Sequence, residues 1–159
     1  MSDSLLAPTF LFRFSVPCRR AHPLWKPKGI TLGERYRLPC FRELEQRPLF
    51  ADVRAAWSDT GLAFAVRVSG KKQSLWCRAS RVEDSDGLHV WIDTRDTHTI
   101  HRASRFCHRF AFLPFGAGKG NTQPVARLLA INRARAHPKS IDERMLRVRS
   151  EKRLNGYIL

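Results

Sequence analysis

Two of the four tryptophans are placed where an aromatic ring can stack on a ligand. Residues 88–93, LHVWID, alternate apolar and polar side chains with the period of a half-buried strand, and Trp91 falls on the polar side. An outward ring framed by polar side chains suits the apolar face of a sugar ring. Burial of Trp91 under a neighbouring loop or under the N-terminal segment is the alternative. The candidate ligand-binding residues are Trp76, Trp91, His89, Arg78 and Arg109.

Carboxylates cluster just before this strand, in the run EDSDG of residues 83–87. Calcium prefers several carboxylate and carbonyl oxygens, although the spacing here is not that of an EF-hand loop. The calcium candidates are Asp84, Asp86 and Asp93, with Glu83 and Asp96 beside them. Pairing of these carboxylates with nearby arginines (Arg78, Arg81, Arg95) is the simpler interpretation, so we expect no cofactor and keep calcium as the alternative.

A second group of metal-ligating side chains follows the strand. His98, His101, Cys107 and His108 have the chemistry to ligate zinc or haem iron. Their spacing matches no closed zinc site, and consecutive residues on a strand, such as Cys107 and His108, point to opposite faces. We therefore interpret the group as surface histidines on a connecting loop. The chain has four cysteines and no C-x-x-C pair, and we expect reduced thiols.

Sequence motifs of the common catalytic centres do not occur. There is no G-x-S-x-G, H-E-x-x-H, phosphate-binding loop or dinucleotide fingerprint. Asp86 and Asp93 lie an odd number of residues apart at the two ends of one expected strand, so they face opposite sides and make a poor glycosidase pair. The sequence therefore predicts a protein that is not an enzyme.

Positive charge is concentrated in the last third of the chain. The formal net charge is +15, and residues 101–159 carry thirteen Lys and Arg against three Asp and Glu. Such a stretch can follow a phosphate or sulfate backbone, whereas a solvated arginine-rich surface is the alternative. The residues placed to do so are Arg133, Arg135, Lys139, Arg144, Arg147, Arg149, Lys152 and Arg153.

Short strands separated by turns account for most of the pattern. Residues 51–57 and 62–68 alternate around the turn Ser58–Gly61, which predicts a hairpin with one apolar face and Trp57 in the core. Further strands are expected over 9–16, 34–38, 88–93, 106–113, 144–150 and 157–159, the last two around an Asn155-Gly156 turn. Residues 41–46 predict one helical turn, 116–120 a loop, and 123–131 a strand or short helix. The expected fold is an all-β antiparallel sandwich in one domain.

The order of these segments resembles a known family. The runs ADVRAAWSDTGLAFAVRV, EDSDGLHVWIDTRD, FCHRFAFLPFG and NGYIL, with Trp76 between the first two, resemble the family 9 carbohydrate-binding modules, related in fold to the haem- and sugar-binding DOMON domains. The resemblance covers residues 50–159 and implies a jelly-roll sandwich, with residues 1–49 as a loop-rich segment packed on it. In that family the G-Y strand continues into an acidic residue and an I-P segment. Here the chain stops at Leu159, so we expect a last strand that is short or missing.

These observations favour a non-catalytic domain that binds carbohydrate. One alternative is a binder of anionic polymers, either nucleic acid or sulfated polysaccharide, through the basic last third. A second is a haem-binding DOMON-like domain, suggested by fold relatedness and by His101 and His108. Asp3 in place of a basic start and Arg13 within the first apolar stretch argue against a signal peptide, and no run reaches the ~20 apolar residues of a membrane span. The cytoplasm is the default expectation, and the oligomeric state stays open.

Overall fold

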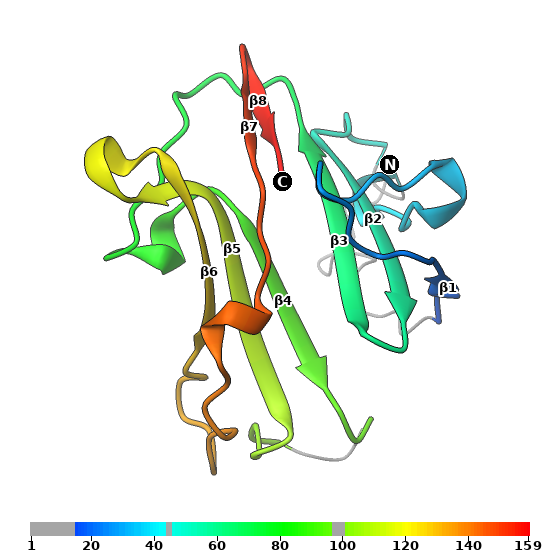
Figure 1. Ribbon diagram of the computed structural model, residues 1–159, viewed down its shortest axis with the longest axis vertical. Helices are drawn as coiled ribbons and strands as arrows, with labels where there is room; N and C mark the ends of the chain where they lie inside the picture. The colour runs from blue at the N-terminus through cyan, green and yellow to red at the C-terminus, as the bar shows by residue number, and fades with distance from the viewer. Residues whose placement is uncertain (1–14, 44–45, 97–100) are drawn as a thin grey trace, which may run out of the picture. The chain divides into compact units, whose positions relative to one another are not determined.

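The computed structural model describes residues 15–43, 46–96 and 101–159, and this part of the chain is mostly strand with little helix (Figure 1). The strands belong to two sheets in which most neighbours run antiparallel. The predicted all-β class is therefore confirmed. The strands are β1 (Arg19–Arg20), β2 (Ala51–Ser58), β3 (Gly61–Val68), β4 (Leu88–Asp93), β5 (Cys107–Ala117), β6 (Gln123–Leu129), β7 (Glu151–Arg153) and β8 (Gly156–Ile158). The 3-10 turns are η2 (Glu34–Tyr36), η3 (Phe41–Glu43), η4 (Val82–Asp84), η5 (Lys119–Asn121) and η6 (Glu143–Met145).

Two compact units make up the chain. Residues 1–72 with Ile158 form the first, and residues 73–157 with Leu159 form the second. The expectation of one domain with a segment 1–49 on a core 50–159 stays a prediction. No disulfide joins the four cysteines, all of which lie in described residues. Within the described ranges, no helix has the length and apolar character needed to cross a membrane.

The hairpin of the first unit forms as predicted. β2 and β3 pair antiparallel without a break from Ala51 opposite Val68 to Ser58 opposite Gly61. Gly61 has a φ of 143°, which favours glycine at the end of this tight turn. The short strand β1 lies parallel to β2, with Arg19 opposite Ala56. The alternation of residues 51–68 was thus sufficient to locate both strands and their register.

The hairpin of the first unit is buried on its predicted apolar face, at Val66 and Val68, and also on the opposite face, which was not expected. Ala56 is completely buried with Leu24, Leu32 and Tyr36, and the alanines of β3 pack against this cluster. Trp57, predicted to be a core residue, is 39% exposed. Small side chains on one hairpin face allow the preceding segment to pack closely there, while Trp57 points to the other face beside the turn. The prediction for Trp57 was therefore wrong.

The loop-rich approach to the hairpin holds one further error. Residues 34–38 were predicted as a strand, but Glu34–Tyr36 form the 3-10 turn η2, in which the backbone N–H of Tyr36 donates to Gly33 O at 3.1 Å. The turn buries Tyr36 in the core and brings the Glu34 carboxylate to Arg54 of β2. Backbone pairing with the edge of β2 begins only after the turn, where Leu38 N donates to Val53 O. The predicted helical turn at 41–46 is present as η3 over its first three residues. Of the predicted strand 9–16, residues 9–14 lie outside the described part, and 15–16 have no regular structure.

The second unit is built on the antiparallel sheet β4–β5–β6 (Figure 1). Its core contains Val82, Ala111, Leu113 and Val125, all on one face. The opposite face of β5 carries the predicted aromatic row, in which His108 stacks on Phe110 and Phe110 on Phe112 with centroids 6.0 and 6.5 Å apart. Residues 123–129, for which strand and helix were both open, form β6. The strands at 88–93 and 106–113 are confirmed to within a few residues at their ends.

The loop predicted at residues 116–120 begins later than expected. β5 runs on to Ala117 through an irregular register after Leu113. Gly116, which suggested a loop, has a φ of 123°, and a Cβ there would meet Ala79 N at 3.1 Å and Arg78 N at 3.2 Å. The glycine permits close approach of another backbone within a strand, so its presence did not indicate the end of the strand.

The end of the chain was predicted partly correctly. Residues 144–150 were expected to be a strand, but the Asp142 side chain accepts a hydrogen bond from Arg144 N and caps the 3-10 turn η6 instead. The hairpin strands are the shorter β7 and β8, which follow one another through a turn at residues 154–155. Tyr157 on β8 is buried. The hairpin near Asn155-Gly156 is therefore confirmed, and its first strand begins seven residues later than predicted.

Candidate binding site on the β4–β5 sheet face

A loop of residues 76–86, here called the covering loop, precedes β4 in the second unit. Its two ends are joined by hydrogen bonds: Trp76 N donates to Asp86 Oδ2 at 2.8 Å, and Asp86 N donates to Trp76 O at 2.8 Å. One step further in, Arg78 N donates to Ser85 Oγ at 2.9 Å. The loop is thereby closed on itself, and its tip, which contains η4, has a defined position.

The covering loop covers one half of a sheet face. Val82 packs in the core with Ala111 and Leu113, and Ala79 accepts a hydrogen bond from the Arg127 side chain at 3.1 Å. Every second side chain of β5 lies on this face, so Arg109, two residues before Ala111, lies on the same side. The other half of the face, beyond the edge of the loop, therefore begins at Arg109 and its neighbours on β4.

Trp91 lies on that second half of the face. It pairs directly with Arg109 across β4 and β5, and it is 60% exposed. The alternation within residues 88–93 had predicted this outward position, and burial under a loop is excluded by the exposure. A large exposed indole beside the edge of the covering loop is unusual, because proteins bury most of the surface area of their tryptophans.

Arg109 joins the loop to the sheet. Its Nη1 donates to Glu83 Oε1 at 2.8 Å, its Nη2 lies 3.4 Å from His89 Nδ1, and its Cζ is 5.0 Å from the centre of the Trp91 ring. The side chain is only 13% exposed. Its Nε is buried, and no hydrogen-bond partner for it occurs among the described residues. The guanidinium is therefore held in one orientation by groups on three sides.

His89 is electrostatically coupled to this arginine. Burial, and secondarily the positive charge of Arg109, lowers the pKa of His89 below 6.5, while a hydrogen bond with the Val82 backbone and the Glu83 charge act in the opposite direction. The imidazole is accordingly neutral at pH 7, and a neutral Nδ1 can accept from the guanidinium. His89 is engaged by both Arg109 and Val82, and its contact helps to fix the orientation of Arg109.

The five predicted ligand-binding residues fall into two groups. Trp91, His89 and Arg109 come together as described. Trp76 and Arg78 lie at the base of the covering loop, where the guanidinium Cζ atoms of Arg78 and Arg81 are 5.6 and 5.7 Å from the centre of the Trp76 ring. Trp76 is thus also an aromatic–cation cluster, but its ring is less exposed than that of Trp91.

Glu83 was missed as a member of the site. It was considered only as a calcium ligand or as a partner of arginines close in sequence, whereas its actual partner is 26 residues away. Its side chain is 71% exposed, so one face of the carboxylate remains accessible to solvent. Neither spacing nor residue type in the sequence signals this contact, which depends on how the covering loop folds over the sheet.

The calcium candidates are engaged separately. Asp84 pairs with Arg81 at 2.6 Å, as the simpler interpretation had proposed. Asp86 accepts from the backbone of Trp76, and Asp93 Oδ1 accepts from Arg95 N at 3.0 Å. Among the residues that the structure describes, no three His, Cys, Asp or Glu side chains gather as a metal site.

The histidine and cysteine group does not assemble either. His98 lies outside the described residues, and His101 is exposed. His108 Nδ1 lies 3.0 Å from Phe106 O and its ring stacks on Phe110, while Cys107 lies near Ser104 on the opposite face of β5. The placement of Cys107 and His108 on opposite faces agrees with the expectation for consecutive strand residues.

Comparison with known proteins adds no relatives. No protein-family model, no curated protein and no solved structure matches the chain. The resemblance to the family 9 carbohydrate-binding modules therefore stays a prediction. What the site does has to be argued from the chemistry of its own residues.

Proposed function

We propose that this chain is a non-catalytic carbohydrate-binding domain of the family 9-like, jelly-roll type, with Trp91 as its stacking platform. The observation that supports this most strongly is the 60% exposure of Trp91 beside the nearly buried Arg109. A sugar ring presents an apolar face of C–H groups and a rim of hydroxyls. An indole matches the first and fixed polar groups match the second.

Each residue of the site has a distinct part in this proposal. Trp91 stacks on the sugar with the ring face that Arg109 does not cover. The exposed side of the Glu83 carboxylate accepts from one or two sugar hydroxyls. Arg109 holds both groups at a fixed spacing, and His89 fixes Arg109 in turn. A preorganised surface of this kind loses little conformational entropy when it binds.

The expected affinity is low. One aromatic contact contributes about 0.5–1.5 kcal/mol beyond the area it buries, and a shallow site adds few hydrogen bonds. A dissociation constant near the millimolar range, about −4 kcal/mol, follows for a single sugar unit. An oligosaccharide that covers more of the sheet face is expected to bind more tightly.

Isothermal titration against a panel of soluble glycans tests the proposal. We expect binding to at least one neutral glycan and a loss of at least about tenfold in Trp91→Ala. Trp57→Ala is the matched control, since Trp57 is also partly exposed but belongs to the first unit. Equal loss of affinity in both variants contradicts the proposal. So does the absence of binding to any glycan at about 10 mM, a concentration at which millimolar affinity would be detected.

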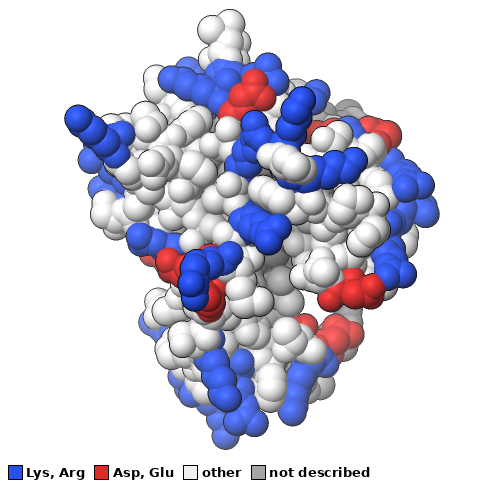
Figure 2. Space-filling view, viewed as in Figure 1, with Lys and Arg blue, Asp and Glu red and all other residues white. Residues whose placement is uncertain are grey.

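A second candidate function, binding of an anionic polymer, rests on a different part of the second unit. The segment before β5 and the segment after β6 are joined by hydrogen bonds: Arg102 Nε donates to Arg133 O at 2.9 Å, and Arg135 N donates to Ala103 O at 2.8 Å. These bonds bring together four exposed arginines, namely Arg102, Arg105, Arg133 and Arg135. Figure 2 shows Lys and Arg side chains gathered at the end of the second unit where these segments lie.

Salt dependence distinguishes this candidate. Binding that neutralises phosphates or sulfates releases counterions, so the affinity for DNA or heparin should fall steeply between about 50 and 200 mM salt. The double variant Arg133→Gln/Arg135→Gln should reduce both affinity and slope, whereas Lys28→Gln/Lys72→Gln, which removes the same charge elsewhere, should not. A salt-insensitive interaction, or the same loss in both double variants, contradicts it. Stronger binding to a sulfated than to a neutral polysaccharide would mean that the chain binds a carbohydrate that is itself an anionic polymer, which combines the two candidate functions.

A haem site, the remaining alternative, gains no argument from the described residues. His108 is committed to a backbone carbonyl and to a stacked ring, and His101 is exposed on the loop before β5. We therefore do not propose it.

A further inference from the structure

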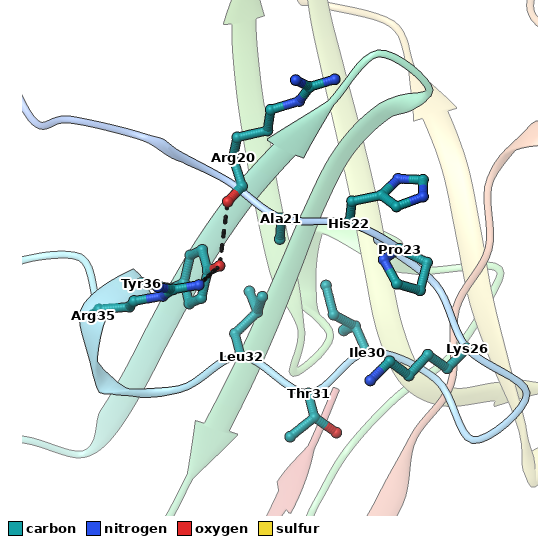
Figure 3. Close-up of a pocket in the computed structure, with 10 residues that line it drawn as sticks. All are labelled: Arg20, Ala21, His22, Pro23, Lys26, Ile30, Thr31, Leu32, Arg35 and Tyr36. Atoms are coloured by element: carbon teal, nitrogen blue, oxygen red, sulfur yellow. Dashed lines mark hydrogen bonds between the residues drawn. The ribbon is translucent and has the colours of Figure 1, made fainter.

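The first unit contains a cavity of about 260 Å³ that has no part in the carbohydrate proposal. Two stretches of the chain form it, one after β1 and one leading into η2 (Figure 3). Its lining residues are Arg20, Ala21, His22, Pro23, Lys26, Ile30, Thr31, Leu32, Arg35 and Tyr36. All ten are described residues of the first unit, so the cavity is defined without reference to the second.

The charged groups of this cavity have one sign. None of the ten lining residues, all within the described part of the chain, is Asp or Glu, whereas Lys26 and Arg35 are exposed cations on its wall. In Figure 3 the Lys26 side chain extends back across the cavity toward Ile30, while the guanidinium of Arg20 points away from it. Arg20 contributes its backbone carbonyl instead, which accepts from Tyr36 Oη at 3.2 Å.

Arg35 is oriented by the buried tyrosine next to it. Its Nη2 donates to Tyr36 Oη at 2.7 Å, and its Cζ lies 4.8 Å from the centre of the Tyr36 ring. A guanidinium has five N–H donors and an ammonium has three. One of the arginine donors is used by Tyr36. The remaining N–H donors of Arg35 and Lys26 outnumber the hydroxyl acceptors of the cavity lining, which are those of Thr31 and Tyr36.

The lining of the cavity is mostly polar, with a small apolar floor. Leu32 is buried in the core of the first unit, and Ala21 and Ile30 pack against the same cluster. A ligand that fits must therefore have a small carbon body against this floor and an acceptor-rich, negatively charged group against Arg35, with further acceptors toward Lys26. The volume is slightly below the range of about 300–1,000 Å³ typical of drug-sized ligands, so we expect a ligand smaller than those.

We infer that this cavity is a second ligand-binding site, independent of Trp91, which takes a small phosphate monoester. The phosphate lies against Arg35 and Tyr36, and the polar part of the carbon body lies toward Lys26 and Thr31. A phosphate has three terminal oxygens and a charge near −2, so it satisfies the donor surplus better than a carboxylate with two oxygens. Arginine in a fixed orientation is the side chain best suited to bind such a group through two parallel hydrogen bonds.

Isothermal titration with glycerol 3-phosphate tests the inference, with glycerol as the neutral ligand and lactate as the carboxylate. We expect millimolar or tighter binding of the phosphate, a loss of about tenfold or more in Arg35→Gln and a smaller, severalfold loss in Lys26→Gln. Lys28→Gln is the matched control, because Lys28 is exposed two residues away and does not line the cavity. Trp91→Ala should leave phosphate binding unchanged, which separates this inference from the carbohydrate proposal.

Several outcomes would overturn the inference. If glycerol 3-phosphate gives no heat of binding at about 10 mM, a concentration at which millimolar affinity would be detected, the proposed site is wrong. An equal loss in Lys28→Gln and Lys26→Gln means that binding reflects diffuse positive charge, and equal affinity for lactate removes the phosphate preference. Arg35→Gln can disturb Tyr36, so its thermal unfolding is compared with that of the wild type. Lys26→Gln, whose side chain belongs to no core cluster, decides the result if Arg35→Gln is unfolded.

Discussion

The guanidinium of Arg109 lies over the indole of Trp91, with 5.0 Å between Cζ and the ring centre, and the two residues are direct partners across β4 and β5. Because Arg109 is almost buried and is bonded to the covering loop, the position of the indole depends on a contact between two elements distant in sequence. A cation–π contact of this kind contributes about 0.5–2 kcal/mol, more as it is desolvated. One face of the ring is thereby used within the protein, while much of the indole stays exposed to solvent.

Arg109 and Glu83 should contribute unequally to stability although they form one ion pair. Arg109→Ala is expected to lower the free energy of unfolding by about 1–3 kcal/mol, because it removes a packed side chain and its contacts to Trp91 and His89. Glu83→Gln should cost less than about 1 kcal/mol, since the carboxylate is mostly exposed. Urea denaturation of the two variants measures both values. Equal losses would mean that the pair, and not the packing of Arg109, fixes the site.

His89 should make the second unit less stable in mild acid. Its pKa is lowered in the folded protein, so the unfolded chain binds more protons below pH 6.5, and stability falls as the pH decreases from 6.5 toward the folded pKa. At pH 7 and above this contribution is fully present. The free energy of unfolding measured from pH 7.5 to 5 should therefore decline less in His89→Gln than in the wild type. An identical slope in the two proteins would show that His89 is not held neutral by the fold.

Two glycines give a matched steric comparison. In Gly87→Ala the new Cβ would meet Phe112 O at 2.5 Å and Leu113 Cδ2 at 2.8 Å, so β4 and β5 must separate where the covering loop joins the sheet. Overpacking of this kind costs about 1–3 kcal/mol. In Gly33→Ala nothing lies within 4 Å of the new Cβ and the backbone φ is −73°, so a small stabilisation of about 0.4–1 kcal/mol is expected. Thermal unfolding of both variants checks the difference, which disappears if the approach of Gly87 to β5 is incorrect.

Tyr157 should ionise only at high pH. Burial, with smaller contributions from the Asp86 and Cys77 charges, raises the pKa of Tyr157 to about 12. The folded protein therefore retains a proton that the unfolded chain has lost above pH 10, and stability falls as the pH rises from 10 to about 12. The chain has two tyrosines, so absorbance titration of Tyr36→Phe reports Tyr157 alone. A titration midpoint near pH 10 in the folded variant would show that β8 is not packed as described.

Much of the fold was predictable because alternation with a period of two acts locally. It located the β2–β3 hairpin, β4 and most of β5, and it placed Trp91 on the outward side. The same rule predicted Trp57 wrongly. Ala55, Val66 and Val68 on its face of the hairpin are buried, but Trp57 lies at the end of that face beside the turn, where it stays 39% exposed. Here the alanine face of the hairpin is packed by the segment before it, which periodicity cannot show.

The site itself was predictable in part. Trp91, His89 and Arg109 came from residue type and from the strand assignment, and the structure brings them together. Glu83 was not predicted as their partner, since the contact spans 26 residues and depends on the path of the covering loop. Gly116 was read as a loop signal for the same reason: its function is to let that loop pass close to β5. Contacts between a loop and a distant strand leave no local pattern in a single sequence.

Stacking of a glycan on Trp91 can be followed through the indole N–H signals of the four tryptophans in a ¹⁵N-labelled sample during glycan titration. Trp91→Phe assigns the signal of interest and keeps an aromatic ring in the site. We expect the Trp91 signal to shift with saturation as glycan is added, while the signals of Trp25 and Trp57 in the first unit remain unchanged. A bound glycan that leaves the Trp91 signal in place, or that moves the Trp57 signal instead, would contradict this expectation.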